Sequence, residues 1–228
     1  MTSVDFYGER IVIRNGPDDG DAFVYGGQVI SPTSEFVDMI INAFQSAATY
    51  TDGSTGRQLE CMKIVAKTNS IFWAGIEIYY QPESVADDPC CKNSSIISYL
   101  MNMMDLPNKV YIYQTDNRSF GGASHLATNK WGRKMSKIFI SPQAALTAPL
   151  MRDDGGRGNE AVMPFDVNLM HELLGHAEFW FSGKYHHHSD ESWNYYDSED
   201  PRTDPILERE NEYRAWKGYP LRYEKYRP

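Results

Sequence analysis

Apolar positions recur at two different spacings along the chain, and these spacings predict where strands and helices lie. Residues 9–30 alternate short β-rich runs with turns rich in glycine and aspartate, which predicts a small hairpin or meander. The runs are Arg10 to Arg14, Ala22 to Tyr25 and Gln28 to Ile30. A helix should follow, with Ser31 as its N-cap and Pro32 at its first position. Its apolar residues share one face, which we expect to be core: Phe36, Ile40, Ala43, Phe44 and Ala47.

The central part of the chain mixes both patterns. After a turn at residues 51–56, Leu59, Met62 and Val65 predict a short helix over Arg57 to Ala66. The apolar run SIISYLMNMMDL predicts another short helix. Strands are expected at Ser70 to Tyr80, Lys109 to Gln114 and Lys137 to Ser141. The composition of residues 115–132 and 152–159 is typical of loops.

Two helices are predicted in the C-terminal part. The first opens at Pro164 and stops at Gly183, with one apolar face: Val167, Met170, Leu174, Ala177 and Phe181. The second runs from Pro205 to Gly218. A β-rich, mixed N-terminal portion followed by helices indicates the α+β class. The length of 228 residues favours a single domain spanning residues 1–228.

Composition and charge exclude several classes of function. The chain is 41% hydrophobic and 23% charged, as in ordinary globular proteins, and its net charge is −9. This acidic balance argues against nucleic-acid binding and against adhesion to anionic membranes. Apolar runs are too short for membrane insertion, and the N-terminus MTSVDFYGER lacks the pattern of a signal peptide. We therefore expect any export to use no cleavable signal.

The three cysteines are Cys61, Cys90 and Cys91. An odd count without the spacing of metal ligands favours a reducing compartment. Cys61 is interpreted as a small buried apolar residue.

The strongest chemical signal is the segment HELLGH, residues 171–176. Zinc-binding helices usually carry their two histidines at positions i and i+4, whereas His171 and His176 are five residues apart. On an ideal α-helix this spacing turns the two side chains about 140° from one another. A one-residue π-type insertion would bring them back together, and Gly175 is the natural place for the backbone to adapt. We therefore predict that His171 and His176 bind zinc.

A catalytic zinc ion takes a third protein ligand. The predicted C-terminal helix offers Glu208, Glu210 and Glu212, and spacing alone does not choose among them. Glu208 and Glu212 share one face, while Glu210 lies on the other.

The chemistry expected of such a site is hydrolysis. Glu172, directly after the first histidine, is placed to act as the general base. Tyr213 or Arg214 would help to stabilise the oxyanion. The cluster His186, His187 and His188 and the loop residue His125 are interpreted as incidental histidines.

At HELLGHA and RENEYRAWKGYPLR together, the sequence resembles the NleD-type zinc metallopeptidases, which are bacterial type III effectors and related toxin domains. SEFVDMIINAFQSA, STGRQL and TDNRSFGGA are similar to further stretches of that family. The family usually carries HExxH, so HExxGH is a departure; the same longer spacing is found in dipeptidyl peptidase III. The resemblance implies a zincin-like fold and Glu210 as the third ligand.

The resemblance also implies a function, a partner and a location. The implied function is that of a monomeric secreted zinc endopeptidase, and the implied partner is a host protein as substrate. The implied location is the host cytosol, after delivery by a type III system. The alternative is a catalytically impaired relative that keeps the fold as a protein-binding module. Loss of peptidase activity with a chelator and with Glu172→Gln would separate the two.

Overall fold

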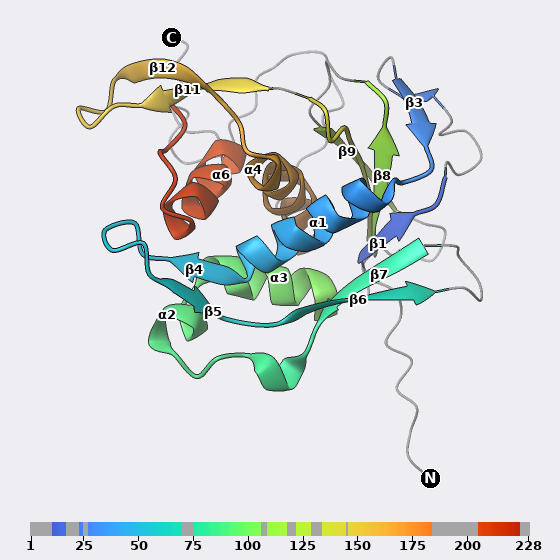
Figure 1. Cartoon of the computed structure of the whole chain (residues 1–228), viewed down its shortest axis with the longest axis horizontal. Helices are drawn as coiled ribbons and strands as arrows, with labels where there is room; N and C mark the ends of the chain where they lie inside the picture. The colour runs from blue at the N-terminus through green and yellow to red at the C-terminus, as the bar shows by residue number, and fades with distance from the viewer. Residues whose placement is uncertain are drawn as a thin grey trace.

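The fold is known from a computed structural model. It describes residues 11–16, 23–24, 27–69, 75–105, 109–117, 122–128, 134–144, 146–183 and 205–223. Within these residues, helices gather on one side of a mixed β-sheet (Figure 1). The predicted α+β class is thereby confirmed.

The main sheet is built around β8. Its strands are β1 (Ile11–Arg14), β2 (Phe23–Val24), β3 (Gly27–Ile30), β6 (Ile64–Asn69), β7 (Gly75–Tyr80), β8 (Lys109–Thr115), β9 (Gly122–Thr128) and β10 (Lys134–Ile140). On one side, β8 pairs in parallel with β10, which pairs antiparallel with β9. On its other side, β8 pairs with β1 in parallel and with β3 antiparallel. Beyond β1 follow β7 and β6, so that β9 and β6 lie toward opposite ends of the sheet.

Alternation along β8 separates the two faces of the sheet. Val110 and Ile112 are fully buried and belong to the main core, together with the apolar faces of the helices. Tyr113 points to the other face, where its ring stacks on Phe139 with the centroids 5.1 Å apart. The larger hydrophobic cluster therefore lies on the helix-covered face, as the two-residue period of a strand requires.

The helices are α1 (Ser34–Ala47), η1 (Pro82–Ser84), α2 (Pro89–Lys92), α3 (Ser95–Asp105), α4 (Phe165–Met170), η2 (His171–Ala177), α5 (Glu178–Ser182) and α6 (Pro205–Trp216). The apolar face predicted for α1 is confirmed, since its five residues are all buried. The predicted N-cap is wrong by two residues: the hydroxyl of Thr33, not of Ser31, accepts from the backbone N–H of Phe36 at 3.1 Å. None of the described helices has the length and apolar composition that crossing a membrane requires.

Two predictions for the central part were wrong because antiparallel pairing between strands that are neighbours in the sequence decides the structure there. Residues 57–66 were expected to form a helix, but β5 (Gln58–Glu60) pairs with β4 (Thr49–Thr51), and β6 pairs with β7. Residues 115–132 were expected to form a loop, but β9 lies within them and pairs with β10 along its whole length. A second small hairpin joins β11 (Thr147–Met151) to β12 (Arg157–Val162).

Asp166, in the first turn of α4, ties three helical segments together. Its Oδ2 accepts hydrogen bonds from the hydroxyls of Tyr213 at 2.7 Å, Ser46 at 3.2 Å and Tyr219 at 3.3 Å. Burial and the Asp166 charge raise the pKa of Tyr219 to about 12, so this hydroxyl stays a donor at neutral pH. The start of the helix that carries HELLGH is thus fixed to α1 and to the end of α6.

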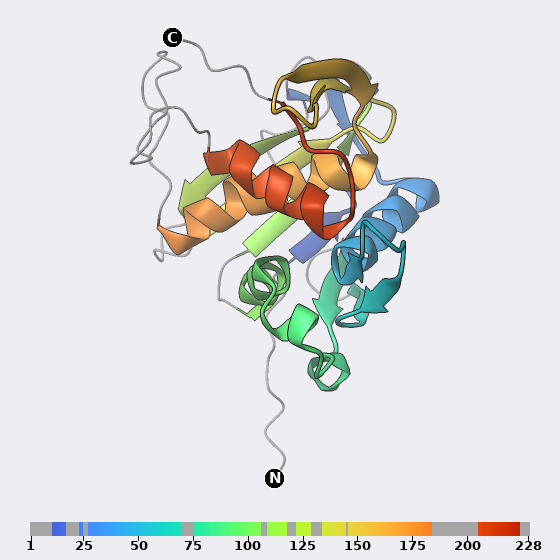
Figure 2. The same ribbon diagram turned by 90° about the vertical axis from the view of Figure 1, so that its left-hand side faces the viewer.

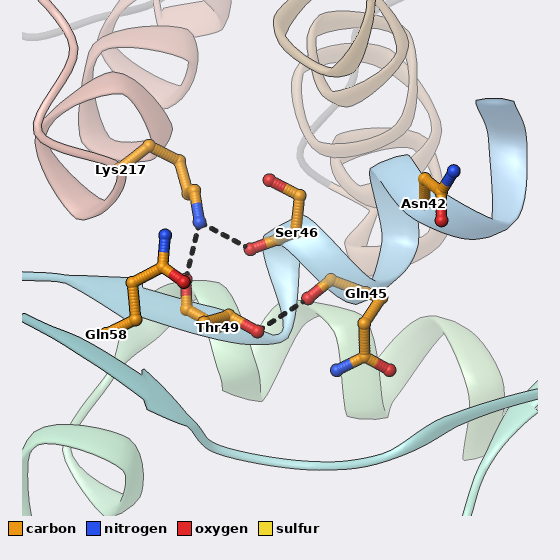
Figure 3. Close-up of a pocket in the computed structure, with 6 residues that line it drawn as sticks. All are labelled: Asn42, Gln45, Ser46, Thr49, Gln58 and Lys217. Carbon is orange, nitrogen blue, oxygen red and sulfur yellow. Dashed lines mark hydrogen bonds between the residues drawn. The ribbon is translucent and has the colours of Figure 1, made fainter.

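The end of α1 is held by α6 in the same region. The ammonium group of Lys217 donates to the carbonyls of Ser46 at 2.9 Å and Thr49 at 2.8 Å (Figure 3). The indole of Trp216 donates to the carbonyl of Ala47 at 2.9 Å. The carbonyls of Ser46 and Ala47 are at the C-terminal end of α1, where a cation is favoured, and that of Thr49 follows directly in β4. The polar hollow drawn in Figure 3 is therefore a helix-capping arrangement.

Cys61 and Cys91 form a disulfide that joins the β5–β6 connection to α2, and both residues are buried. The interpretation of Cys61 as an unpaired apolar residue was wrong. The sequence could not show this pairing, because Cys90 and Cys91 are adjacent and either could have formed the disulfide with Cys61. Cys90 is the exposed free thiol.

We predict that reducing this disulfide lowers the free energy of unfolding by about 2–4 kcal/mol, because the bridge restricts the unfolded chain. Chemical denaturation of the Cys61→Ala/Cys91→Ala variant and of reduced wild type checks this. Cys90→Ser is the matched control and should match the wild type. Three reactive thiols in the native, unreduced protein would contradict the pairing.

Candidate metal centre

The helix predicted between Pro164 and Gly183 is one continuous rod with a π segment in its middle. α4 begins at Phe165, η2 follows at His171–Ala177, and α5 ends at Ser182. The N–H of Glu178 donates to the carbonyl of Leu173, five residues earlier, as a π-type bond does. Gly183, at φ 75°, ends the helix in the left-handed region. The predicted π-type insertion in HELLGH is confirmed.

The π segment brings three metal-binding side chains together. One ligand atom of each of His171, Glu172 and His176 lies within 4.8 Å of the other two. The two imidazole rings are 5.2 Å apart between centroids and stand at 74° to each other. On an α-helix the same two residues would diverge by about 140°. The local winding of the backbone is therefore what makes a shared metal geometrically possible.

Gly175 is required for a reason other than the one that the sequence indicated. Its backbone is not in the left-handed region, so no unusual dihedral needs a glycine there. A Cβ at this position would lie 2.6 Å from Cγ2 of Ile206, at the start of α6. The missing side chain allows α6 to pack directly on η2, and Figure 2 shows α6 crossing the helix that carries HELLGH.

Glu172 lies beneath β9 and is only 4% exposed. A Cβ added at Gly122, the first residue of β9, would lie 3.1 Å from Cγ and 3.2 Å from Oε1 of Glu172. Gly122 therefore leaves just enough room for this carboxylate. The sheet, through β9, fixes one side of the candidate site, and α6 fixes the other.

Glu210 contacts His171 without belonging to the three-residue group. Its Oε2 is 2.9 Å from Nδ1 of His171 and also accepts from the guanidinium of Arg222 at 2.9 Å. Its Oε1 accepts from Nε of Arg214 at 2.7 Å. The side chain is 0% exposed. The sequence predicted Glu210 as a metal ligand, but both of its oxygens already have protein partners.

The charges around Glu210 favour its ionised form. Burial would raise the pKa of Glu210, but the hydrogen bond to His171 and the charges of His171 and Arg222 lower it to about 2. Burial would likewise lower the pKa of His171, but the hydrogen bond to Glu210 and the negative charge of Glu172 raise it. Glu210 is therefore a buried anion, stabilised by the groups around it.

Arg209, the residue before Glu210, also holds α6 in place. Its guanidinium lies over the ring of Tyr99, 3.5 Å from the centroid, and 4.7 Å from that of Phe179. It also faces the carboxylate of Glu178 on α5, at 3.6 Å. Contacts with α3 and α5 thus set the position of the helix that carries Glu210.

The other predicted site residues have different surroundings. Tyr213 is fully buried with its hydroxyl on Asp166, which is a packing role. Arg214 is 2% exposed and bound to Glu210 and to the carbonyl of Pro220. Glu208 and Glu212 are exposed, and the carboxylate of Glu212 lies 3.7 Å from the guanidinium of the buried Arg209. The backbone of His125 pairs with Lys137 in β9–β10, and residues 186–188 lie outside the described part of the chain.

Sequence reasoning missed Arg222 and Gly122. Arg222 is the last residue of the segment RENEYRAWKGYPLR, but the resemblance assigned no role to it, and its contact with Glu210 was found from the fold. Gly122 lies in the stretch TDNRSFGGA, within residues 115–132, whose composition predicted a loop and gave no role to this glycine. The role of each residue follows from its contact in the fold, Gly122 against Glu172 and Arg222 against Glu210.

The donor set suits a divalent transition metal. Two imidazoles and a carboxylate are ligands that zinc accepts, and zinc sites commonly combine them. Among the described residues, His171, Glu172 and His176 form the group of metal-binding side chains that lie close enough to share one ion. The site therefore offers the imidazoles of His171 and His176 and, beside them, the carboxylate of Glu172.

We predict that Gly175→Ala lowers the free energy of unfolding by about 1–3 kcal/mol, because its methyl group would collide with Ile206. Denaturant titration measures the change. Ile206→Ala removes the colliding atom, so the double variant should lose less than the sum of the two single changes. Strict additivity would contradict the close contact between η2 and α6.

No protein-family model, curated protein or solved structure matches this chain. The fold is therefore described as a mixed α+β arrangement of a sheet with helices on one face. Any assignment of chemistry has to come from the side chains around η2.

Proposed function

We propose that the protein is a zinc-dependent endopeptidase whose metal is held by His171 and His176, with Glu172 as the general base. The observation that carries this proposal is the π segment, which gathers the ligand atoms of these three residues within 4.8 Å. An amphipathic helix needs no such irregularity for packing alone. Irregular windings of this kind are concentrated at functional sites.

In the proposed reaction, His171 and His176 bind the metal and Glu172 transfers protons. A zinc ion bound by the two imidazoles would supply a Lewis acid for water and for the peptide carbonyl. Glu172 would take a proton from the attacking water at its carboxylate and deliver a proton to the leaving amine. Its burial against Gly122 holds the carboxylate in one position beside the two imidazoles. A fixed base needs little reorganisation during the reaction.

The glutamates of α6 differ in the contacts that they make around the two histidines. Glu210 would have to release its contacts with His171 and Arg222 in order to reach a metal held by the two histidines. Glu208 is exposed, and Glu212 is 47% exposed and 3.7 Å from Arg209. We therefore propose His171 and His176 as the ligands and include no glutamate of α6 among them.

Fold family, substrate and location are proposed from the sequence resemblance. HELLGHA and RENEYRAWKGYPLR support membership of the NleD-type peptidases and a zincin-like fold. On that basis the substrate is a host protein, and the chain acts as a monomeric effector after delivery by a type III system. The position of α6 against η2 agrees with a family in which both segments belong to one site.

The alternative is a protein-binding module that has kept the site without its activity. The specific observation in its favour is the burial of Glu172, because a base that is only 4% exposed has restricted access to water. The two functions differ in one measurable property, which is turnover.

We predict that Glu172→Gln lowers peptidase activity about 100-fold or more while leaving zinc content unchanged, because only the base is removed. The probes are fluorescently labelled casein and an equimolar peptide library read by mass spectrometry. Exposed Glu160→Gln, on β12, is the matched control. Full activity in the Glu172 variant would remove this residue from the mechanism, and inactivity of zinc-loaded wild type on all probes would favour the binding module.

We also predict that Gly122→Ala lowers kcat/KM roughly tenfold, because the new methyl group displaces the Glu172 carboxylate by a few tenths of an ångström. Zinc affinity should change little, since neither histidine is touched. Gly16→Ala is the control, because a Cβ at Gly16 meets nothing within 4 Å. Wild-type kinetics in the Gly122 variant would show that β9 does not position the base.

A further inference from the structure

The carboxylate of Glu210 is fully buried between one histidine and two arginines. Arg214 is on the same helix, four residues later, and binds Oε1 at 2.7 Å. Arg222 comes from the segment after α6 and binds Oε2, the oxygen that also faces Nδ1 of His171. A buried carboxylate is costly unless it is paired and hydrogen-bonded, and these three groups fulfil that requirement. Oε2 is thus shared by a candidate metal ligand and by Arg222.

The backbone of Arg222 is held in place from two sides. The carboxamide of Asn211 donates to the carbonyl of Arg222 at 3.0 Å and accepts from its N–H at 2.7 Å. On the other side, Arg222 forms an antiparallel bridge with Leu150 of β11. The neighbouring N–H groups of Met151 and Tyr223 continue this pairing. The C-terminal segment is therefore anchored at the point where its guanidinium reaches Glu210.

We propose that Arg222 is a positioning residue of the metal centre, which holds Glu210 so that this carboxylate keeps His171 in one orientation and one tautomer. This inference rests on the proposed zinc function. The chain of contacts runs from Asn211 and β11 to Arg222, then to Glu210 and His171. It assigns to Glu210 the role of orienting a ligand instead of binding the metal.

The physical basis is the pair of nitrogens in imidazole. A carboxylate at Nδ1 requires the proton to be on Nδ1, which leaves the lone pair of Nε2 free for a metal. The same hydrogen bond fixes the rotation of the ring. Arg222 matters for this because it shares Oε2 with His171, whereas Arg214 holds the opposite oxygen. Without Arg222, the Glu210 carboxylate is paired with Arg214 alone. Its Oε2 then loses the arginine contact that fixes its position beside His171.

Arg222→Gln is a practical test, because the Arg222 side chain is 33% exposed and its backbone anchors do not depend on the guanidinium. Zinc affinity would be measured by competition with a chelator. The expected loss is about tenfold, the lower end of the roughly 10–100-fold range for partners of ligating histidines. Arg222→Lys should recover part of the affinity. Arg157→Gln, which removes an exposed arginine paired with Glu160 on β12, should keep wild-type affinity.

The second readout is the tautomer of His171 in metal-free protein, from nitrogen-15 histidine NMR above the pH at which its imidazole loses its proton. The wild type should show the proton on Nδ1. Arg222→Gln should show a shifted or mixed population. This measurement needs no metal. A wild type that fails to bind zinc would overturn the proposed function, and the tautomer would still show whether Arg222 and Glu210 orient the imidazole of His171.

Two results would overturn the positioning role. One is an Arg222→Gln variant with wild-type zinc affinity and an unchanged His171 tautomer. The other is a Glu210→Gln variant, folded by circular dichroism, whose zinc affinity falls far beyond 100-fold, because that loss would identify Glu210 as a ligand. A fall of about 10–100-fold in the Glu210 variant, with a changed tautomer, supports the positioning role.

Discussion

The candidate site depends on the winding of seven residues. In η2 the backbone hydrogen bonds span five residues, so the imidazoles of His171 and His176 come to the same side of the helix. The chain joins this segment to α-helical turns on both sides, and buried residues such as Leu169 and Phe181 anchor both flanks in the core. An irregular segment between two well-packed flanks cannot relax into a regular helix without rotating one flank out of the core.

Neighbouring elements are fitted to this segment. α6 approaches through Gly175, and β9 covers Glu172 through Gly122, so both contacts depend on the absence of a side chain. α6 also carries Glu210, whose buried charge is balanced by the arginines at 214 and 222. The geometry of η2, the close approach of α6 and the charge balance around His171 are therefore one connected arrangement. A change in any of them is expected to reach the histidines.

Local sequence signals predicted α1, α3, α6 and the helix that carries HELLGH, but they also predicted a helix over residues 57–66, where β5 and the start of β6 lie. HELLGH implied an insertion, and the apolar spacing around it predicted the helix between residues 164 and 183, because both are properties of a short segment. The pairing of β9 with β10 and the disulfide between Cys61 and Cys91 are contacts between two segments, which the periodicity within one segment does not encode. Glu210 was found as a candidate, but only the fold revealed that its oxygens face His171 and the two arginines.

Zinc stoichiometry of the purified protein, measured by elemental analysis after purification without chelators, tests the central claim most directly. We predict one zinc ion per chain in the wild type and its loss in His176→Ala. The triple alanine variant of residues 186–188 should keep the ion, because that cluster is interpreted as incidental. A wild type without zinc, or zinc that persists in His176→Ala and disappears with residues 186–188, would contradict the account.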